Sequence, residues 1–345
     1  MAEPRIHRLR IAEVIEETAD ARSLVFESAS QLPYRPGQFL TFRLPGADPG
    51  AETARCYSLA SSPHTGEPPK VTVKRVPGGL GSNWLCDHAV PGTEVEVLPP
   101  AGTFTPPGLD ADLLLVAGGS GITPVMSILK SVLTRGRGRL TLLYANRGET
   151  SVIFRDELRE LAEEYPDRLL VLHWLESVQG LPAVAGLAAQ LAPYAERAAY
   201  LCGPQPLMDA TEDALRSLGA TRDRLHRERF FSLSGEVFAA PAVPEVPAAP
   251  AADERTTTAE VTLDGVVHRI DWPSRTPLLD ALLAAGVDAP YSCREGACAA
   301  CTCRVVDGEV SMARNEVLDD TDLAEGYVLA CQSVPLTERV EITYS

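Results

Sequence analysis

The chain has 345 residues, more than one ordinary hydrophobic core organises, which favours two or three domains. Its 31 Lys plus Arg against 47 Asp plus Glu give a formal net charge of -16, which excludes the phosphate neutralisation that nucleic-acid binding requires. The longest apolar runs, such as residues 113–117, are far too short for a membrane span, and no secretion signal is evident, so we expect a cytoplasmic protein.

Residues 1–108 predict a small antiparallel β-barrel. Short apolar and β-branched stretches alternate with Gly and Pro turns, as is typical of such barrels. The barrel contains the motif Arg55-Cys56-Tyr57-Ser58 and a glycine-rich segment at 79–85, with a helix expected to begin near Ser82. Each motif alone is weak, since glycine-rich segments are usually turns. The expected strands cover residues 23–27, 38–43, 56–60, 70–76 and 94–98.

Residues 109–238 predict a parallel sheet covered by helices on both faces, because apolar strands alternate with helical stretches. The first strand, 113–117, runs into a glycine turn from Gly118 to Gly121 and then a helix. Glycine lets a phosphate approach the backbone and Pro124 suits a first helical turn, so we expect a nucleotide at this strand end. The other expected strands are 140–146, 169–175 and 198–202, with helices at 124–133, 155–164 and 208–218.

Residues 239–255 are rich in Pro and Ala and predict an extended linker, which at about 3.1 Å per residue reaches roughly 50 Å. Residues 256–345 then predict a separate α+β domain. A hairpin of 259–264 and 267–271 turns at Asp264-Gly265, and a helix follows at 278–285.

Four cysteines in this last domain predict a metal centre. Cys293, Cys298 and Cys301 have the C-x4-C-x2-C spacing of plant-type 2Fe-2S proteins, and Cys331 follows as a fourth ligand. A structural zinc site is the alternative, but zinc ligands usually come as two C-x2-C pairs and only one is present. Cys303 lies two residues after Cys301 and is in reach as a competing ligand; we interpret it as a buried free thiol.

Together these motifs resemble the ferredoxin-reductase family. The order of flavin barrel, nucleotide domain and C-terminal β-grasp ferredoxin domain is similar to the reductase components of multicomponent oxygenases. The resemblance implies an NAD(P)H-dependent oxidoreductase that passes electrons through FAD and a 2Fe-2S cluster to a terminal oxygenase. Stretches 57–64, 82–87 and 173–177 look most like reductases of 3-ketosteroid 9α-hydroxylases in steroid degradation. Reductases of phenylacetyl-CoA epoxidases or other aromatic oxygenases are the alternative, and a zinc-bound redox sensor or scaffold is the non-enzymatic one.

The resemblance also implies residue roles at the flavin. Arg55 pairs with the FAD pyrophosphate, Tyr57 packs on the isoalloxazine, and Ser58 hydrogen-bonds near flavin N5 as a catalytic residue. Phe230, with Phe231, falls where the family places an aromatic ring over the flavin; a hydrophobic anchor before the linker is the alternative. The remaining flavin candidates are Val73, Lys74, Gly81 and Ser82.

At the nucleotide, the resemblance places Cys202 near the nicotinamide as the second catalytic residue, against the alternative of a small buried hydrophobe. Arg147 lies where the adenosine ribose comes, which would favour NADPH, but acidic Glu149 stands close by and we expect NADH. The remaining nucleotide candidates are Gly118, Gly121, Thr123, Pro124, Asn146, Gly203 and Pro204.

Charge is concentrated in the last domain: residues 256–345 hold 15 Asp plus Glu and 6 Arg, a net charge of -9. The segment with Asp319, Asp320 and Asp322 is the densest part. Such charge speeds encounter with a basic partner, so we hypothesise that this segment steers the oxygenase. The alternative is an ordinary solvated surface.

Overall fold

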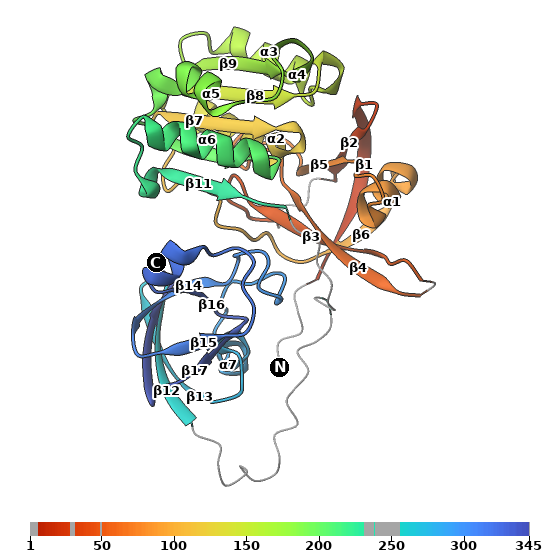
Figure 1. Cartoon of the computed structure of the whole chain (residues 1–345). Helices are drawn as coiled ribbons and strands as arrows, with labels where there is room; N and C mark the ends of the chain where they lie inside the picture. The colour runs from red at the N-terminus through yellow and green to blue at the C-terminus, as the bar shows by residue number, and fades with distance from the viewer. Residues whose placement is uncertain (1–5, 28–31, 49, 231–237, 239–255, 345) are drawn as a thin grey trace. The chain divides into compact units, whose positions relative to one another are not determined.

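The computed structural model describes residues 6–27, 32–48, 50–230, 238 and 256–344 (Figure 1). The predicted linker, 239–255, and Phe231 lie outside the described residues. The chain divides into two compact units, which we treat one at a time. One unit contains residues 8–51 and 56–230, and the other contains residues 231–345 with the short segments 1–7 and 52–55.

The N-terminal part of the chain forms a six-stranded sheet in the order β4-β3-β6-β1-β2-β5. The pairs β1–β2, β2–β5 and β3–β6 are antiparallel, and a bridge from Leu59 to Val71 links the chain after β4 back to β5 at the other edge, as barrel closure requires. The predicted antiparallel barrel is confirmed. The elements are β1 (His7–Thr18), β2 (Ala21–Phe26), β3 (Phe39–Pro45), β4 (Glu52–Ser58), β5 (Lys70–Lys74), α1 (Leu80–His88) and β6 (Glu94–Val97).

The longest barrel strand, β1, was absent from the expected strands. Its sequence is rich in charged residues and only two of its apolar side chains, Leu9 and Ile11, are buried, so the period-2 signal is weak. Ile11 nevertheless packs in the barrel core with Leu24 and Phe42. Tertiary packing, rather than local pattern, therefore decides this strand.

The nucleotide domain follows with a five-stranded parallel sheet in the order β11-β10-β7-β8-β9. One face of β7 packs on α2 and α3, and the other face packs on α5 and α6. The predicted sheet with helices on both faces is confirmed. Its elements are β7 (Leu113–Gly118), α2 (Ile122–Arg135), β8 (Leu140–Asn146), α3 (Arg155–Glu164), β9 (Leu169–Leu175), α4 (Glu176–Gln179), α5 (Val184–Leu191), β10 (Ala198–Cys202), α6 (Gln205–Ser217) and β11 (Leu225–Glu228).

The C-terminal domain has a five-stranded mixed sheet in the order β13-β12-β18-β14-β16, with β15 and β17 paired beside it. Asp264 and Gly265 both have left-handed backbone, at φ 50° and 77°, as a two-residue hairpin turn requires. Helix α7 packs Leu278 and Leu282 into a core with Trp272, and the predicted β-grasp fold is confirmed. The elements are β12 (Thr256–Leu263), β13 (Val266–Pro273), α7 (Leu278–Ala284), β14 (Thr302–Asp307), β15 (Val310–Met312), α8 (Asp320–Ala324), β16 (Tyr327–Leu329), β17 (Ser333–Pro335) and β18 (Arg339–Thr343).

Candidate functional site

The cysteine loop lies between α7 and β14, and Cys331 follows β16. Backbone N–H groups of Glu295 and Ala297 point at the Cys293 sulfur at 3.4 Å each, and the Cys293 N–H points at the Cys298 sulfur at 3.3 Å. The hydrogen bond from Cys298, with these N–H groups, lowers the pKa of Cys293 below its ordinary value. These contacts therefore favour a thiolate at Cys293, the form in which cysteine binds metal.

The four thiols form two pairs. Cys293 pairs with Cys298, and Cys301 shares a hydrogen bond with Cys331. Within residues 6–27, 32–48, 50–230, 238 and 256–344, no three His, Cys, Asp or Glu side chains gather tightly enough to hold one metal ion. Two pairs of thiolates are the donor set that two bridged irons need, so these residues fit a 2Fe-2S cluster.

Cys303 is not part of either pair. It is buried in the core of the domain, its thiol donates to the Val328 carbonyl at 3.8 Å, and burial raises its pKa to about 12. Its contact with a backbone carbonyl in the core, apart from both pairs, fits a buried free thiol.

Strand β4 presents the predicted flavin residues. Ser58 is 2% exposed, and its hydroxyl has no hydrogen-bond partner among the described residues. Burying an unpaired hydroxyl is unfavourable, so the atom fits a site that a bound flavin completes. Tyr57 is half-buried and meets Phe42 edge to face at 5.3 Å between ring centres, and the Arg55 guanidinium donates to the Ala54 carbonyl at 2.7 Å.

The other flavin candidates surround α1 and β5. Helix α1 has no side-chain N-cap, which leaves backbone N–H groups available to an anion. The Ser82 hydroxyl accepts from the Val76 N–H at 3.2 Å, so it closes the preceding turn. Val73 and Gly81 are buried, and Lys74 lies 3.7 Å from the Asp20 carboxylate.

The nucleotide candidates meet at the carboxyl ends of β7 and β10. The strand register pairs Ala117 with Cys202, which brings the turn at Gly118 beside the segment from Cys202 to Pro204. A Cβ on Gly121 would lie 2.0 Å from the Cys202 carbonyl oxygen, and one on Gly203 would lie 2.9 Å from the Gly118 nitrogen. The two turns can therefore pack on each other only with glycine at these positions. This requirement was not predicted from the sequence.

Around this point, Thr123 is buried and its hydroxyl donates to the Ser120 carbonyl at 3.0 Å, while Pro124 lies in the first turn of α2 as expected. Asn146 ends β8 and is buried. Its side chain has no hydrogen bond of good geometry from the residues that the structure describes, although the Tyr144 hydroxyl is close enough to interact with it. Arg147 follows, exposed, with its guanidinium 3.2 Å from the Asp20 carboxylate.

Sequence reasoning missed Glu228. The parallel pairing of β10 and β11 places it directly beside Cys202, which is 1% exposed. Burial, with the charge of Glu228, raises the pKa of Cys202 well above its ordinary value, and burial raises the pKa of Glu228 to about 8. In sequence, Arg227-Glu228-Arg229 indicates an ordinary charged surface. Only the sheet register reveals that the Glu228 carboxyl lies beside the Cys202 thiol. Phe230 lies two residues further on and is exposed.

Three family models match the chain in this order: an oxidoreductase FAD-binding domain at 8–105, an oxidoreductase NAD-binding domain at 115–213, and a 2Fe-2S iron-sulfur cluster binding domain at 261–336. The chain is 55% identical to the 3-ketosteroid-9-alpha-monooxygenase ferredoxin reductase component of Rhodococcus rhodochrous, over 97% of this chain and 96% of the relative. It is 34% identical to a 1,2-phenylacetyl-CoA epoxidase protein of Escherichia coli, over 98% and 97%. The crystal structure of phthalate dioxygenase reductase aligns with a TM-score of 0.58 at 26% identity, over 98% of each chain.

The fold, the cysteine pairs and the three matched domains define an FAD- and NAD-binding oxidoreductase with a 2Fe-2S domain. Within that class, the chain belongs to the family of 3-ketosteroid-9-alpha-monooxygenase ferredoxin reductase components. The predicted family and the FAD, NAD and 2Fe-2S cofactors are confirmed, and the phenylacetyl-CoA epoxidase alternative is the more distant relative. None of the helices in the described part of the chain is long and apolar enough to cross a bilayer.

Proposed function

We propose that this reductase supplies electrons from NADH to the terminal oxygenase of a 3-ketosteroid 9α-hydroxylase in the cytoplasm. The observation that carries the choice of partner is the 55% identity to a reductase component of that name, against 34% for the phenylacetyl-CoA epoxidase protein. The domains in this proposal are residues 1–108 for FAD, 109–238 for NADH, 239–255 as linker and 256–345 for the cluster.

Bound FAD would supply the conversion between the two electrons of a hydride and the single electrons that a 2Fe-2S cluster takes up, which is why both groups are needed. In this proposal Arg55 and the α1 N-terminus hold the pyrophosphate, because a guanidinium fork and free N–H groups suit phosphate oxygens. The Ser58 hydroxyl gains its missing partner at the flavin edge. Cys202, kept as a neutral thiol, packs against the nicotinamide without placing a negative charge beside it.

NADH is favoured over NADPH by the environment of Arg147. A 2′-phosphate is best bound by an arginine whose charge is free, whereas Arg147 is already paired with Asp20. Acidic Glu149, exposed two residues away, adds a repulsive charge. We expect kcat/KM for NADH to exceed that for NADPH by about two- to fivefold, since Arg147 is exposed and contacts between exposed charges are worth up to about 1 kcal/mol. Equal values for the two nucleotides would contradict this assignment.

The whole scheme is tested on the purified protein with its cofactors. NADH added without oxygen should bleach flavin absorbance first, and the reduced cluster should then give its electron paramagnetic resonance signal. The steroid oxygenase should be reduced faster than a phenylacetyl-CoA epoxidase oxygenase. A protein that carries zinc and no visible chromophore would overturn the proposal.

A further inference from the structure

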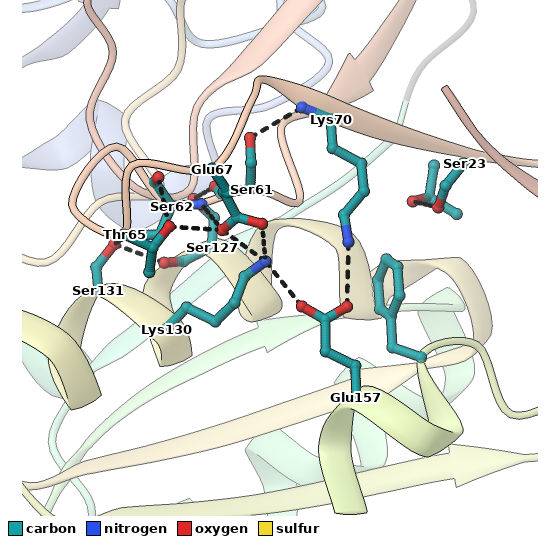
Figure 2. A network of polar contacts seen from close by, with 12 residues as sticks. Ser23, Ser61, Ser62, Thr65, Glu67, Lys70, Ser127, Lys130, Ser131 and Glu157 are labelled. Atoms are coloured by element: carbon teal, nitrogen blue, oxygen red, sulfur yellow. Dashed lines mark hydrogen bonds and ion pairs between the residues drawn. The ribbon is translucent and has the colours of Figure 1, made fainter. Parts of the chain in front are cut away.

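A row of four charged side chains, two buried lysines and two half-buried glutamates, joins the flavin barrel to the nucleotide domain (Figure 2). Lys130 Nζ lies 2.8 Å from the Glu67 carboxylate and 2.9 Å from one oxygen of Glu157, whose other oxygen lies 3.1 Å from Lys70 Nζ. The lysine side chains are 6% and 11% exposed, and those of Glu67 and Glu157 are 25% and 31% exposed. We name the row Glu67, Lys130, Glu157 and Lys70 the charged row; its signs alternate along its length.

The charged row crosses between the two domains twice. Glu67 and Lys70 belong to the barrel, while Lys130 comes from α2 and Glu157 from α3. Glu67 therefore pairs with Lys130 across the boundary, and Lys70 pairs with Glu157 across it. Burial alone would raise the pKa of Glu157, but the charges of Lys130 and Lys70 hold this pKa below its ordinary value. Each domain thus supplies one cation and one anion.

Hydroxyl groups hold the same boundary. Ser127 Oγ donates to the Ser61 carbonyl at 2.6 Å, and the hydroxyls of Ser62 and Ser131 lie 2.8 Å apart. On the barrel side, the Glu67 carboxylate accepts from the Ser62 N–H at 2.7 Å. A hydrogen bond within its own loop therefore holds the Glu67 carboxylate in one orientation, and this orientation fixes the position from which Lys130 can pair with it.

In sequence, the residues at this boundary lie near the segments proposed to bind FAD and NADH. Ser61, which accepts from α2, follows the flavin residue Ser58 by three positions. Helix α2, which carries Ser127 and Lys130, begins directly after the nucleotide turn that ends at Gly121. A rotation between the domains would move these two segments against each other.

From this geometry we infer that the charged row positions the nucleotide domain on the flavin barrel for hydride transfer. The inference rests on the proposed placement of FAD at Ser58 and NADH at the glycine turn. An ion pair that is shielded from water contributes little net stability, because the cost of desolvation offsets the attraction between the charges. Alternating charges nevertheless pair correctly in only one relative position of the two domains. Hydride transfer requires that register, since a displacement of about 1 Å can cost about 100-fold in rate.

The test uses flavin reduction by NADH in anaerobic stopped flow, with NADH deuterated at C4 as a second substrate. Lys130→Met keeps the length of the side chain and removes the central charge. We expect its hydride-transfer rate to fall by about 10- to 100-fold, with a changed isotope effect and a weaker long-wavelength charge-transfer band. FAD content and the Kd for NAD⁺ should stay at wild-type values, and Lys130→Arg should restore most of the rate.

The matched control is Arg137→Met, which removes a cation from the exposed pair with Asp110 inside the nucleotide domain. This variant should leave the hydride-transfer rate, the isotope effect and the charge-transfer band unchanged. Glu67→Gln keeps its shape and decides the matter if Lys130→Met does not fold; we expect it to lower the hydride-transfer rate in the same direction. Wild-type rate, isotope effect and charge-transfer band in either folded variant would overturn the inference. Failure of the proposed function is distinguished by the wild-type traces, in which NADH would not reduce the flavin at all.

Discussion

The cysteine loop and the end of β10 place the same side chain in opposite electrostatic settings. At Cys293, the neighbouring thiol and backbone N–H groups lower the pKa, so the sulfur is ready to ligate metal. At Cys202, burial and the neighbouring Glu228 raise the pKa, so the sulfur stays a thiol. Hydrogen-bond donors, rather than burial, distinguish these two sulfurs, because both are buried.

The two regions also differ in how they are assembled. Cys293, Cys298 and Cys301 come from one loop, whereas the surroundings of Cys202 come from β7, β10 and β11, and the flavin candidates lie on further segments. A local site should fail completely when one ligand is lost. A dispersed site should lose part of its function with each contact removed.

Cys301→Ser should have the largest effect. Loss of one thiolate should abolish the cluster's paramagnetic signal and electron delivery to the oxygenase, while NADH-dependent ferricyanide reduction at the flavin continues. Cys303→Ser is the matched control, two residues away in the same core, and should leave both activities largely intact. Loss of ferricyanide reduction in a folded Cys301→Ser protein would show that the two regions are not independent.

Arg55→Ala tests the dispersed site. Charge-assisted hydrogen bonds to a phosphate are worth about 1.5 to 3 kcal/mol, so FAD affinity should fall by about tenfold or more. The Kd for FAD, measured by fluorescence on the apoprotein, checks this. Since Arg55 also bonds to Thr53 and Ala54, Arg55→Lys should recover only part of the affinity. FAD retained at wild-type strength in Arg55→Ala would place the pyrophosphate elsewhere.

Glu228→Gln tests the electrostatics beside Cys202. The folded pKa of Glu228, about 8, is above its unfolded value, so its contribution to stability is complete below about pH 4.5 and is lost as pH rises through about 8. The Tm of Glu228→Gln relative to wild type should therefore rise by several degrees between pH 5 and 9. Glu163→Gln, exposed on α3, should show no such trend. A constant difference across that range would mean that Glu228 is solvated.

The smallest expected effect concerns docking on the acidic segment. Asp319 caps α8 by accepting from the N–H groups of Thr321 and Asp322, and Asp322 accepts from the Asp319 N–H, so changing either would disturb the helix. Asp320 and Glu325 are exposed and form no part of that cap. Replacing both by their amides should slow oxygenase reduction about two- to threefold at low salt and flatten its salt dependence. An unchanged rate would reduce the segment to solvated surface.

The sequence by itself was sufficient for several features that a short stretch of chain encodes. Cysteine spacing indicated the cluster, alternating strands and helices indicated the parallel sheet, and Asp264-Gly265 indicated the hairpin, because covalent spacing limits where neighbouring side chains lie. Strands β8, β9 and β10 match the expected residues without shift.

Tertiary structure alone decided the contacts between distant segments. Glu228 meets Cys202 through the β10–β11 register, and Lys130 meets Glu67 across 63 positions of sequence. Strand β1 was likewise decided by packing that composition does not show. The physical reason is that a charged residue looks like solvated surface in sequence, and only the fold determines whether water or another side chain becomes its partner.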